Sequence, residues 1–184
     1  LIAAIDMTVT GAGARLLAER LSGPLTDAHA INRRLDAVSF FAASRPRRQK
    51  LRAELARLPD LARALARLKL GRGGPRDLAA VGRALAIAAT LPPILTAQDA
   101  LAAMPEETAA DLAILTSGDE GIAAALTAAL ADDLPLLARD GGFIRPAYRS
   151  ELDEARELRD NARRVIAGLQ TSYVELTEIG RAHV

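Results

Sequence analysis

The stretch from Ser150 to Leu176 contains no proline and a single glycine, Gly168. Its spacing predicts one helix, which at about 1.5 Å per residue would be a rod of roughly 40 Å. A helix this long with one apolar stripe, placed after a compact domain, indicates a strut rather than a core element. The stripe recurs close to the helical period at Leu152, Ala155, Leu158, Ala162, Val165, Leu169, Tyr173 and Leu176.

The composition extends the helical prediction to the whole chain. Half of the residues are apolar, but only 3% are aromatic. Alanine and leucine, both strong helix formers, supply most of the apolar half, whereas the residues that favour strands are scarce. We therefore predict an all-α fold, with an irregular multi-helix core domain over residues 1–148 and the long C-terminal helix over 149–177.

Punctuating residues divide the predicted core into helices. Thr10 is a candidate N-cap for a helix over about 12–21, which Ser22-Gly23-Pro24 ends. Thr26 or Asp27 caps the next. Asp60 begins a later helix, and Pro75 falls at the first position of another, which we expect to run to Pro92-Pro93. The expected buried stripes are Ile31, Leu35, Val38 and Phe41; Leu51, Leu55 and Leu58; Leu61, Leu65 and Leu68; and Leu78, Val81 and Leu85. Shorter helices are expected around 97–104, 107–115 and 120–130, with a loop over 140–146.

Several protein classes are disfavoured by what the sequence lacks. There is no cysteine, which excludes disulfides and thiolate metal sites. No uninterrupted apolar run of about 20 residues is present for a membrane span, and the first residues do not resemble a signal peptide. We expect a soluble, cytoplasmic protein without a membrane partner. The leucine at position 1 suggests that the sequence begins inside a longer reading frame.

The charges are distributed in two blocks. Residues 33–72 hold twelve Lys/Arg against three acids, a balance of +9, and residues 98–133 hold eight acids and no Lys/Arg, a balance of −8. The basic block could be a nucleic-acid footprint. It could also be a set of solvated helix faces, or the two blocks could face each other. Apart from Phe40-Phe41, no aromatic residue on which a base could stack lies between the arginines, and this scarcity favours solvated helix faces over a nucleic-acid footprint.

No constellation of residues predicts catalysis or ligand binding. The loop Gly71–Asp77 lacks the Gly-Lys-Ser/Thr ending of a phosphate loop, so we read it as a helix stop followed by a helix start. His29 and His183 have no partner at metal-ligand spacing. Adjacent carboxylates on a helix point apart, and those at Glu106-Glu107, Asp119-Glu120 and Asp132-Asp133 are interpreted as helix N-terminal charges. We predict no catalytic, cofactor-binding or metal-binding residue in this chain.

Three segments of the chain stand out together as motifs. They are Asp6–Leu17 with Pro24-Leu25; Leu58–Arg63, Leu65 and Arg67-Leu68 with Arg72–Leu78; and Leu137–Tyr148 with Glu151-Leu152-Asp153 and Leu158. These segments resemble the bacterial DNA mismatch-repair ATPase family MutS, and their order and spacing agree with the family from about residue 1 to 176. Departures are Gly11 and Ala12 in place of Pro-Met, Arg20 in place of a common tryptophan, and Ala62 in place of glutamate.

The resemblance implies a role as core and lever, the region that couples the DNA clamp of such a protein to its ATPase domain. It further implies that the full-length protein binds mismatched double-stranded DNA, a second MutS subunit and mismatch-repair partner proteins, and uses ATP and magnesium. The fragment itself is expected to hold no cofactor and not to be an enzyme. The alternative is a free-standing helical nucleic-acid-binding protein that uses the basic residues 33–72, and a small helical enzyme is a remote third reading.

The final residues 178–184 read differently from the rest. Glu178-Ile179-Gly180-Arg181-Ala182-His183-Val184 breaks the helical pattern, and it can be back-translated into a common sequencing-adapter sequence. We therefore predict a non-native tail that follows authentic sequence ending near Thr177, the alternative being a genuine divergent tail.

Overall fold

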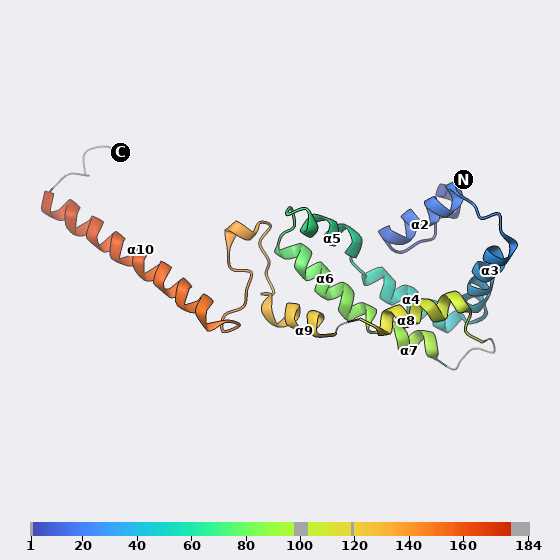
Figure 1. Cartoon of the computed structure of the whole chain (residues 1–184). Coiled ribbons are helices and arrows are strands. Elements are labelled where there is room, and N and C mark those ends of the chain that lie inside the picture. The colour runs from blue at the N-terminus through green and yellow to red at the C-terminus, as the bar shows by residue number, and fades with distance from the viewer. Residues whose placement is uncertain (1, 98–102, 119, 178–184) are drawn as a thin grey trace. The chain divides into compact units, whose positions relative to one another are not determined.

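The computed structural model describes residues 2–97, 103–118 and 120–177, and within them it is all-α without a strand. The predicted fold class is confirmed. The helices are α1 Ile2–Ile5, α2 Gly11–Ser22, α3 Ala28–Ala43, α4 Arg45–Arg57, α5 Leu61–Lys69, α6 Pro75–Ala88, α7 Leu91–Thr96, α8 Glu106–Thr116, α9 Glu120–Ala129 and α10 Ser150–Thr177, with a short 3₁₀ helix η1 at Ala138–Asp140 (Figure 1). The chain forms two compact units, 1–143 and 144–184.

Side-chain caps fix where four of the core helices begin. In each case the cap oxygen accepts the backbone N–H three residues ahead, which satisfies a donor that the helix itself cannot pair. Thr10 caps α2 as predicted, and Asp27 rather than Thr26 caps α3. The four bonds are Gly13 N to Thr10 Oγ1 (2.9 Å), Ala30 N to Asp27 Oδ2 (2.8 Å), Arg47 N to Ser44 Oγ (3.3 Å) and Arg63 N to Asp60 Oδ1 (3.3 Å).

Helix α6 is the central element of the first unit, because both α5 and α9 pack against it. Close approach needs small side chains: a Cβ added to Gly82 of α6 would lie 3.2 Å from Cβ of Leu126 in α9. Helix α4 packs on α7, and α3 packs on α4 and α8. The buried apolar side chains are Phe40, Ala64, Val81, Ala84, Leu91, Leu95, Ala129 and Leu130.

The predicted buried stripe of α3 is wrong in most of its positions. Leu35 and Val38 are 53% and 63% exposed, whereas Phe40 is the buried residue of this helix. The physical reason is the direction from which α4 arrives: Arg47 of α4 lies over the Phe40 ring at 4.3 Å. Periodicity identifies an apolar face, but it does not say which neighbour covers it. Leu65, expected to be buried in α5, is likewise 47% exposed, and Ala64 takes its place.

The prolines at 92 and 93 begin a helix instead of ending one. Helix α6 ends at Ala88, and α7 starts at Leu91 with Pro92 and Pro93 in its first turn. Proline is tolerated there because the first N–H groups of a helix have no intrahelical acceptor. The helix predicted around 97–104 falls mainly on residues 98–102, outside the described part of the chain, as does the predicted tail 178–184.

One helical stretch, 75–96, is long and apolar enough by length and composition to cross a membrane. The sequence reading missed it because Arg76, Asp77 and Arg83 interrupt the apolar pattern. In this fold the stretch comprises α6 and α7, against which α5, α9, α4 and α8 pack. Core helices of non-membrane proteins meet the same criterion, and we interpret 75–96 as such a core pair.

The second unit consists of a loop and α10, which runs from Ser150 to Thr177 without a buried residue. The length matches the sequence prediction, which ended at Leu176. The stripe residues Leu158, Leu169 and Tyr173 are 71%, 65% and 65% exposed. Backbone hydrogen bonds and local ion pairs, rather than packing within the described residues, hold this helix together.

Candidate functional site

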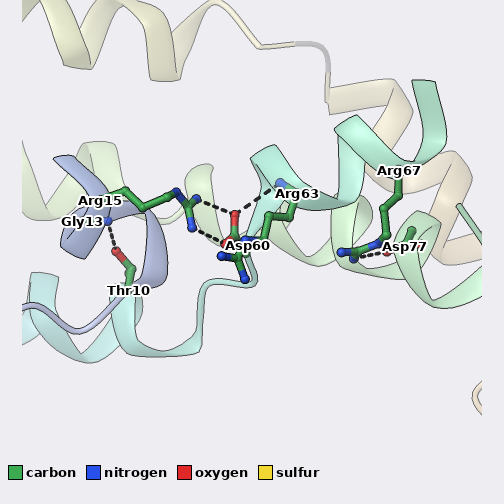
Figure 2. Close-up of polar contacts among 7 residues, drawn as sticks. All are labelled: Thr10, Gly13, Arg15, Asp60, Arg63, Arg67 and Asp77. Atoms are coloured by element: carbon green, nitrogen blue, oxygen red, sulfur yellow. Dashed lines mark hydrogen bonds and ion pairs between the residues drawn. The ribbon is translucent and has the colours of Figure 1, made fainter. Parts of the chain in front are cut away.

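The first two motif segments meet at an ion pair between α2 and the start of α5. The guanidinium of Arg15 donates two parallel hydrogen bonds to the Asp60 carboxylate, at 2.8 Å from Nη1 to Oδ2 and 2.9 Å from Nη2 to Oδ1 (Figure 2). This bidentate geometry fixes the orientation of both groups. Gly11 at the start of α2 lies against the same carboxylate, because an added Cβ would be 3.3 Å from Oδ2.

Asp60 therefore serves two helices at once. It caps α5 through the Arg63 backbone N–H and pairs with Arg15 of α2. The hydrogen bond from Arg15 is the main reason why the pKa of Asp60 lies below its usual range, and the Arg63 N–H lowers that pKa further. A carboxylate held by this many donors stays charged through the neutral range.

An ion pair between Arg67 and Asp77 joins the two parts of the second motif segment. Arg67 Nε of α5 donates to Asp77 Oδ1 of α6 at 2.9 Å, and Arg67 Nη2 bonds to the same oxygen (Figure 2). The other carboxylate oxygen accepts the Gly74 N–H at 3.0 Å. Arg67 first and then the Gly74 N–H lower the pKa of Asp77, against the opposing effect of its partial burial. Asp77 thereby joins both α5 and the connecting loop to the first turn of α6.

The same corner contacts the chain that leads to the third motif segment. Arg76 Nε donates to the Leu134 carbonyl at 3.0 Å. An added Cβ on Gly74 would lie 2.8 Å from the Leu136 carbonyl oxygen, so only glycine fits. A polar seam, defined here as Arg15, Asp60, Arg67, Asp77 and Arg76, thus connects segments that are far apart in the sequence.

The glycines of this corner allow a close approach and a helix end. An added Cβ on Gly73 would come within 2.6 Å of Leu68 Cδ2. Gly71, at φ 68°, follows the end of α5, and Pro75 starts α6, which confirms the predicted helix stop and helix start. The Gly74 N–H donates to Asp77.

A cleft of about 490 Å³ opens beside the corner, with Arg67, Arg72 and Arg76 in its lining. Two of these arginines already have partners within the fold, since Arg67 pairs with Asp77 and Arg76 bonds to Leu134. Arg67 and Arg76 in the lining of the cleft thus hold the corner together.

The histidine and carboxylate candidates do not assemble into a site. Among the described residues, no group of three or more His, Asp or Glu side chains is placed to hold a metal ion. His29 is exposed near the start of α3, as predicted, and His183 lies outside the described part. Glu106 and Glu107 lie in the first turn of α8, where their charge favours the helix dipole.

Half of the basic residues in the block 33–72 make contacts within the fold. Arg47 is buried, and Arg48 bonds to two carbonyls at the end of α3. Six of its twelve basic residues bond within the described part of the chain: Arg47 to Ala97 O, Arg48 to Phe41 O and Ala42 O, Arg52 to Met7 O, Arg57 to Glu54, Arg63 to Asp60 and Arg67 to Asp77. The nucleic-acid reading of this block is not favoured, because side chains spent on the fold are not free to track a phosphate backbone.

In the second unit, the third motif segment builds the junction that leads into α10. The Asp153 carboxylate accepts the Ala147 N–H at 2.6 Å and pairs with Arg156 at 3.0 Å. Arg156 Nη2 also donates to the Ile144 carbonyl at 3.0 Å. The residues Glu151-Leu152-Asp153, singled out from the sequence, thus include the one that ties the loop to the helix.

These features define a helical module in which a multi-helix core is followed along the chain by a long exposed helix. The family model described as MutS domain III matches residues 1–179. The DNA mismatch repair protein MutS of Rhodopseudomonas palustris (strain BisB5) is 50% identical over 179 residues, which is 97% of this chain and 19% of that relative. The chain belongs to the MutS domain III family, and it spans about a fifth of the length of that relative.

Sequence reasoning identified the motif segments but not how their residues pair. Both partners of each seam ion pair lie in quoted motif positions, Arg15 with Asp60 and Arg67 with Asp77. The sequence alone does not say which arginine meets which aspartate.

Proposed function

We propose that this chain is the core and lever of a longer mismatch-repair protein, in which it couples a DNA-gripping part to an ATPase part. The observation that carries the proposal is α10, which extends over Ser150–Thr177 without a buried residue. At about 1.5 Å per residue it is long enough to carry a displacement over roughly 40 Å. A stiff helix transmits such a displacement, whereas a loop would absorb it.

The seam of the first unit also supports this proposal. Helices α2, α5 and α6 are joined by ion pairs with defined geometry, and α6 packs against α9. A base that is cross-linked in this way moves as one body when a force reaches it. The mechanical role therefore uses both parts of the chain.

The remaining activities belong, in this proposal, to parts of the longer protein outside this chain. These are binding of mismatched double-stranded DNA, association with a second MutS subunit and with other repair proteins, and use of ATP and magnesium. The isolated chain is then a non-enzymatic module that works in the cytoplasm. The match to a DNA mismatch repair protein supports this assignment.

Breaking α10 in the full-length protein tests the coupling. Ala162 lies in the middle of α10 and is exposed. Ala162→Pro removes a helical hydrogen bond and costs about 3 kcal/mol of local helix stability. We expect basal ATP hydrolysis and DNA binding to persist while the response of ATP hydrolysis to mismatched DNA falls.

Ala162→Ser is the matched control, because it changes the same exposed position without breaking the helix. It should behave like the wild type. A proline variant that keeps the full response to mismatched DNA would contradict the lever proposal. ATP hydrolysis by the isolated 184-residue chain would contradict the assignment of that activity to other parts.

A further inference from the structure

The turn before α10 contains an unusual backbone conformation. Ala147 has φ 62°, and it is the only non-glycine residue with positive φ in the part of the chain that the structure describes. A side chain is disfavoured in this region because its Cβ crowds the backbone carbonyl. Such a conformation persists only when surrounding contacts hold it in place.

Two side chains of α10 supply those contacts. The Asp153 carboxylate accepts the Ala147 N–H at 2.6 Å, and Arg156 bonds to Asp153 and to the Ile144 carbonyl, each at 3.0 Å. Both side chains are only partly exposed, at 24% for Arg156 and 36% for Asp153. The contacts form a closed set that joins residues 144–147 to the first turns of the helix.

We propose that Asp153 and Arg156 form a latch that keeps the strained turn at Ala147 closed, and that its opening changes the direction in which α10 leaves the loop. This inference rests on the proposed lever function. With the latch closed, loop and helix move together. When Asp153 releases the Ala147 N–H, Ala147 can relax to negative φ and the junction becomes a hinge. The latch residues are positioning residues.

Hydrogen exchange at the Ala147 amide, measured by NMR in the whole 184-residue chain, tests the latch directly. Asp153→Ala should lower protection at Ala147 by about tenfold, because the amide loses its acceptor. Asp153→Asn keeps an oxygen acceptor but weakens the contact with Arg156. Its protection at Ala147 should therefore lie between that of the wild type and that of Asp153→Ala. Unchanged exchange at Ala147 in Asp153→Ala would overturn the proposal.

Glu151→Gln is the matched control. Glu151 is also an acid in the first turn of α10, so its neutralisation removes the same favourable charge at the helix N-terminus without touching Ala147. It should leave protection at Ala147 unchanged. Equal loss in Glu151→Gln and Asp153→Ala would show a general fraying of the helix and would also overturn the latch.

A variant at position 147 separates strain from hydrogen bonding. Ala147→Gly removes the penalty for positive φ but supplies no acceptor, so combined with Asp153→Ala it should leave the amide at position 147 as poorly protected as in Asp153→Ala alone. If Asp153→Ala does not form α10 by circular dichroism, Arg156→Gln carries the test: it should lower protection at Ala147, and no change would overturn the proposal. These readouts do not involve ATP hydrolysis, so failure of the latch is distinguishable from failure of the lever.

Discussion

Arg15 and Asp60, which are 45 residues apart in the sequence, form a bidentate ion pair that joins α2 to the N-terminus of α5. The pair is partly exposed, with side-chain exposures of 43% and 24%. Solvent screens its Coulomb energy, so we assign its main effect to the orientation of α2, which has no buried residue of its own.

Replacing Arg15 by lysine should loosen α2 without unfolding the core. Lysine keeps the charge but cannot make two parallel hydrogen bonds to one carboxylate. We expect faster hydrogen exchange in Gly11–Ser22 and a small decrease in the melting temperature. Arg20→Lys on the same helix is the control, and equal effects of the two variants would contradict a specific role for Arg15.

The seam carboxylates should make stability depend on acid pH. The pKa values of Asp60 and Asp77 are lowered in the folded state from 3.8. Their stabilisation is therefore fully present above the unfolded-state pKa of about 3.9 and is lost as the pH falls through the lower folded-state values. Asp77→Asn should be less stable than wild type at pH 7, and this difference should shrink below about pH 4. A difference that is constant with pH, in urea titrations, would show that the charge of Asp77 does not matter.

Three glycines should respond to alanine in different ways. Gly73→Ala forces a Cβ to within 2.6 Å of Leu68 Cδ2 and 2.8 Å of Leu68 Cα, and should cost about 1–3 kcal/mol through overpacking. Gly71→Ala meets no atom within 4 Å but is held at φ 68°, and should cost about 1 kcal/mol.

Gly168→Ala, with open space in the middle of α10, should instead favour the helix by about 0.5–1 kcal/mol. Urea-induced unfolding followed by circular dichroism measures all three. A neutral Gly73→Ala would contradict the close packing of this corner.

Phe40 and Val38 test which face of α3 is buried. Phe40 is 3% exposed and Val38 is 63% exposed. Phe40→Ala should cost about 3–5 kcal/mol, because it opens a cavity beneath Arg47. Val38→Ala should change stability by less than about 0.5 kcal/mol. A larger loss of stability in Val38→Ala than in Phe40→Ala would show that the face predicted from periodicity is the buried one.

Helix α10 should exchange its amide hydrogens faster than α6. No residue of α10 is buried, whereas α6 buries Val81, Gly82 and Ala84. Local opening is easiest where few apolar contacts must be broken. Protection in α10 equal to that in α6 would show that the helix packs on another surface in solution.

Local signals in the sequence were sufficient for the starts of several core helices, but not for the end of α6. Thr10, Asp27 and Asp60 each cap a helix at or beside the expected position, because capping depends on residues a few positions apart. Burial could not be predicted in the same way. Leu35 and Phe40 lie on the same helix, and the helices that pack on it, α4 and α8, decide that one is exposed and the other buried.

The seam and the latch were beyond sequence reasoning for a similar reason. Arg76 reaches Leu134 across 58 residues, and no local rule selects that carbonyl. The positive φ of Ala147 was equally hidden, because alanine has no preference for that conformation. The family resemblance located these segments without explaining their contacts.

The distance along the chain between Arg15 and Asp60 also affects how the protein is made. Synthesis proceeds from the N-terminus, so α2 leaves the ribosome well before its partner carboxylate does. During that interval α2 has only its own hydrogen bonds and the Thr10 cap, and short isolated helices are marginal in water. Helix α2 must therefore wait for α5, whereas α10, whose hydrogen bonds reach no further than the preceding loop, can form as soon as it emerges.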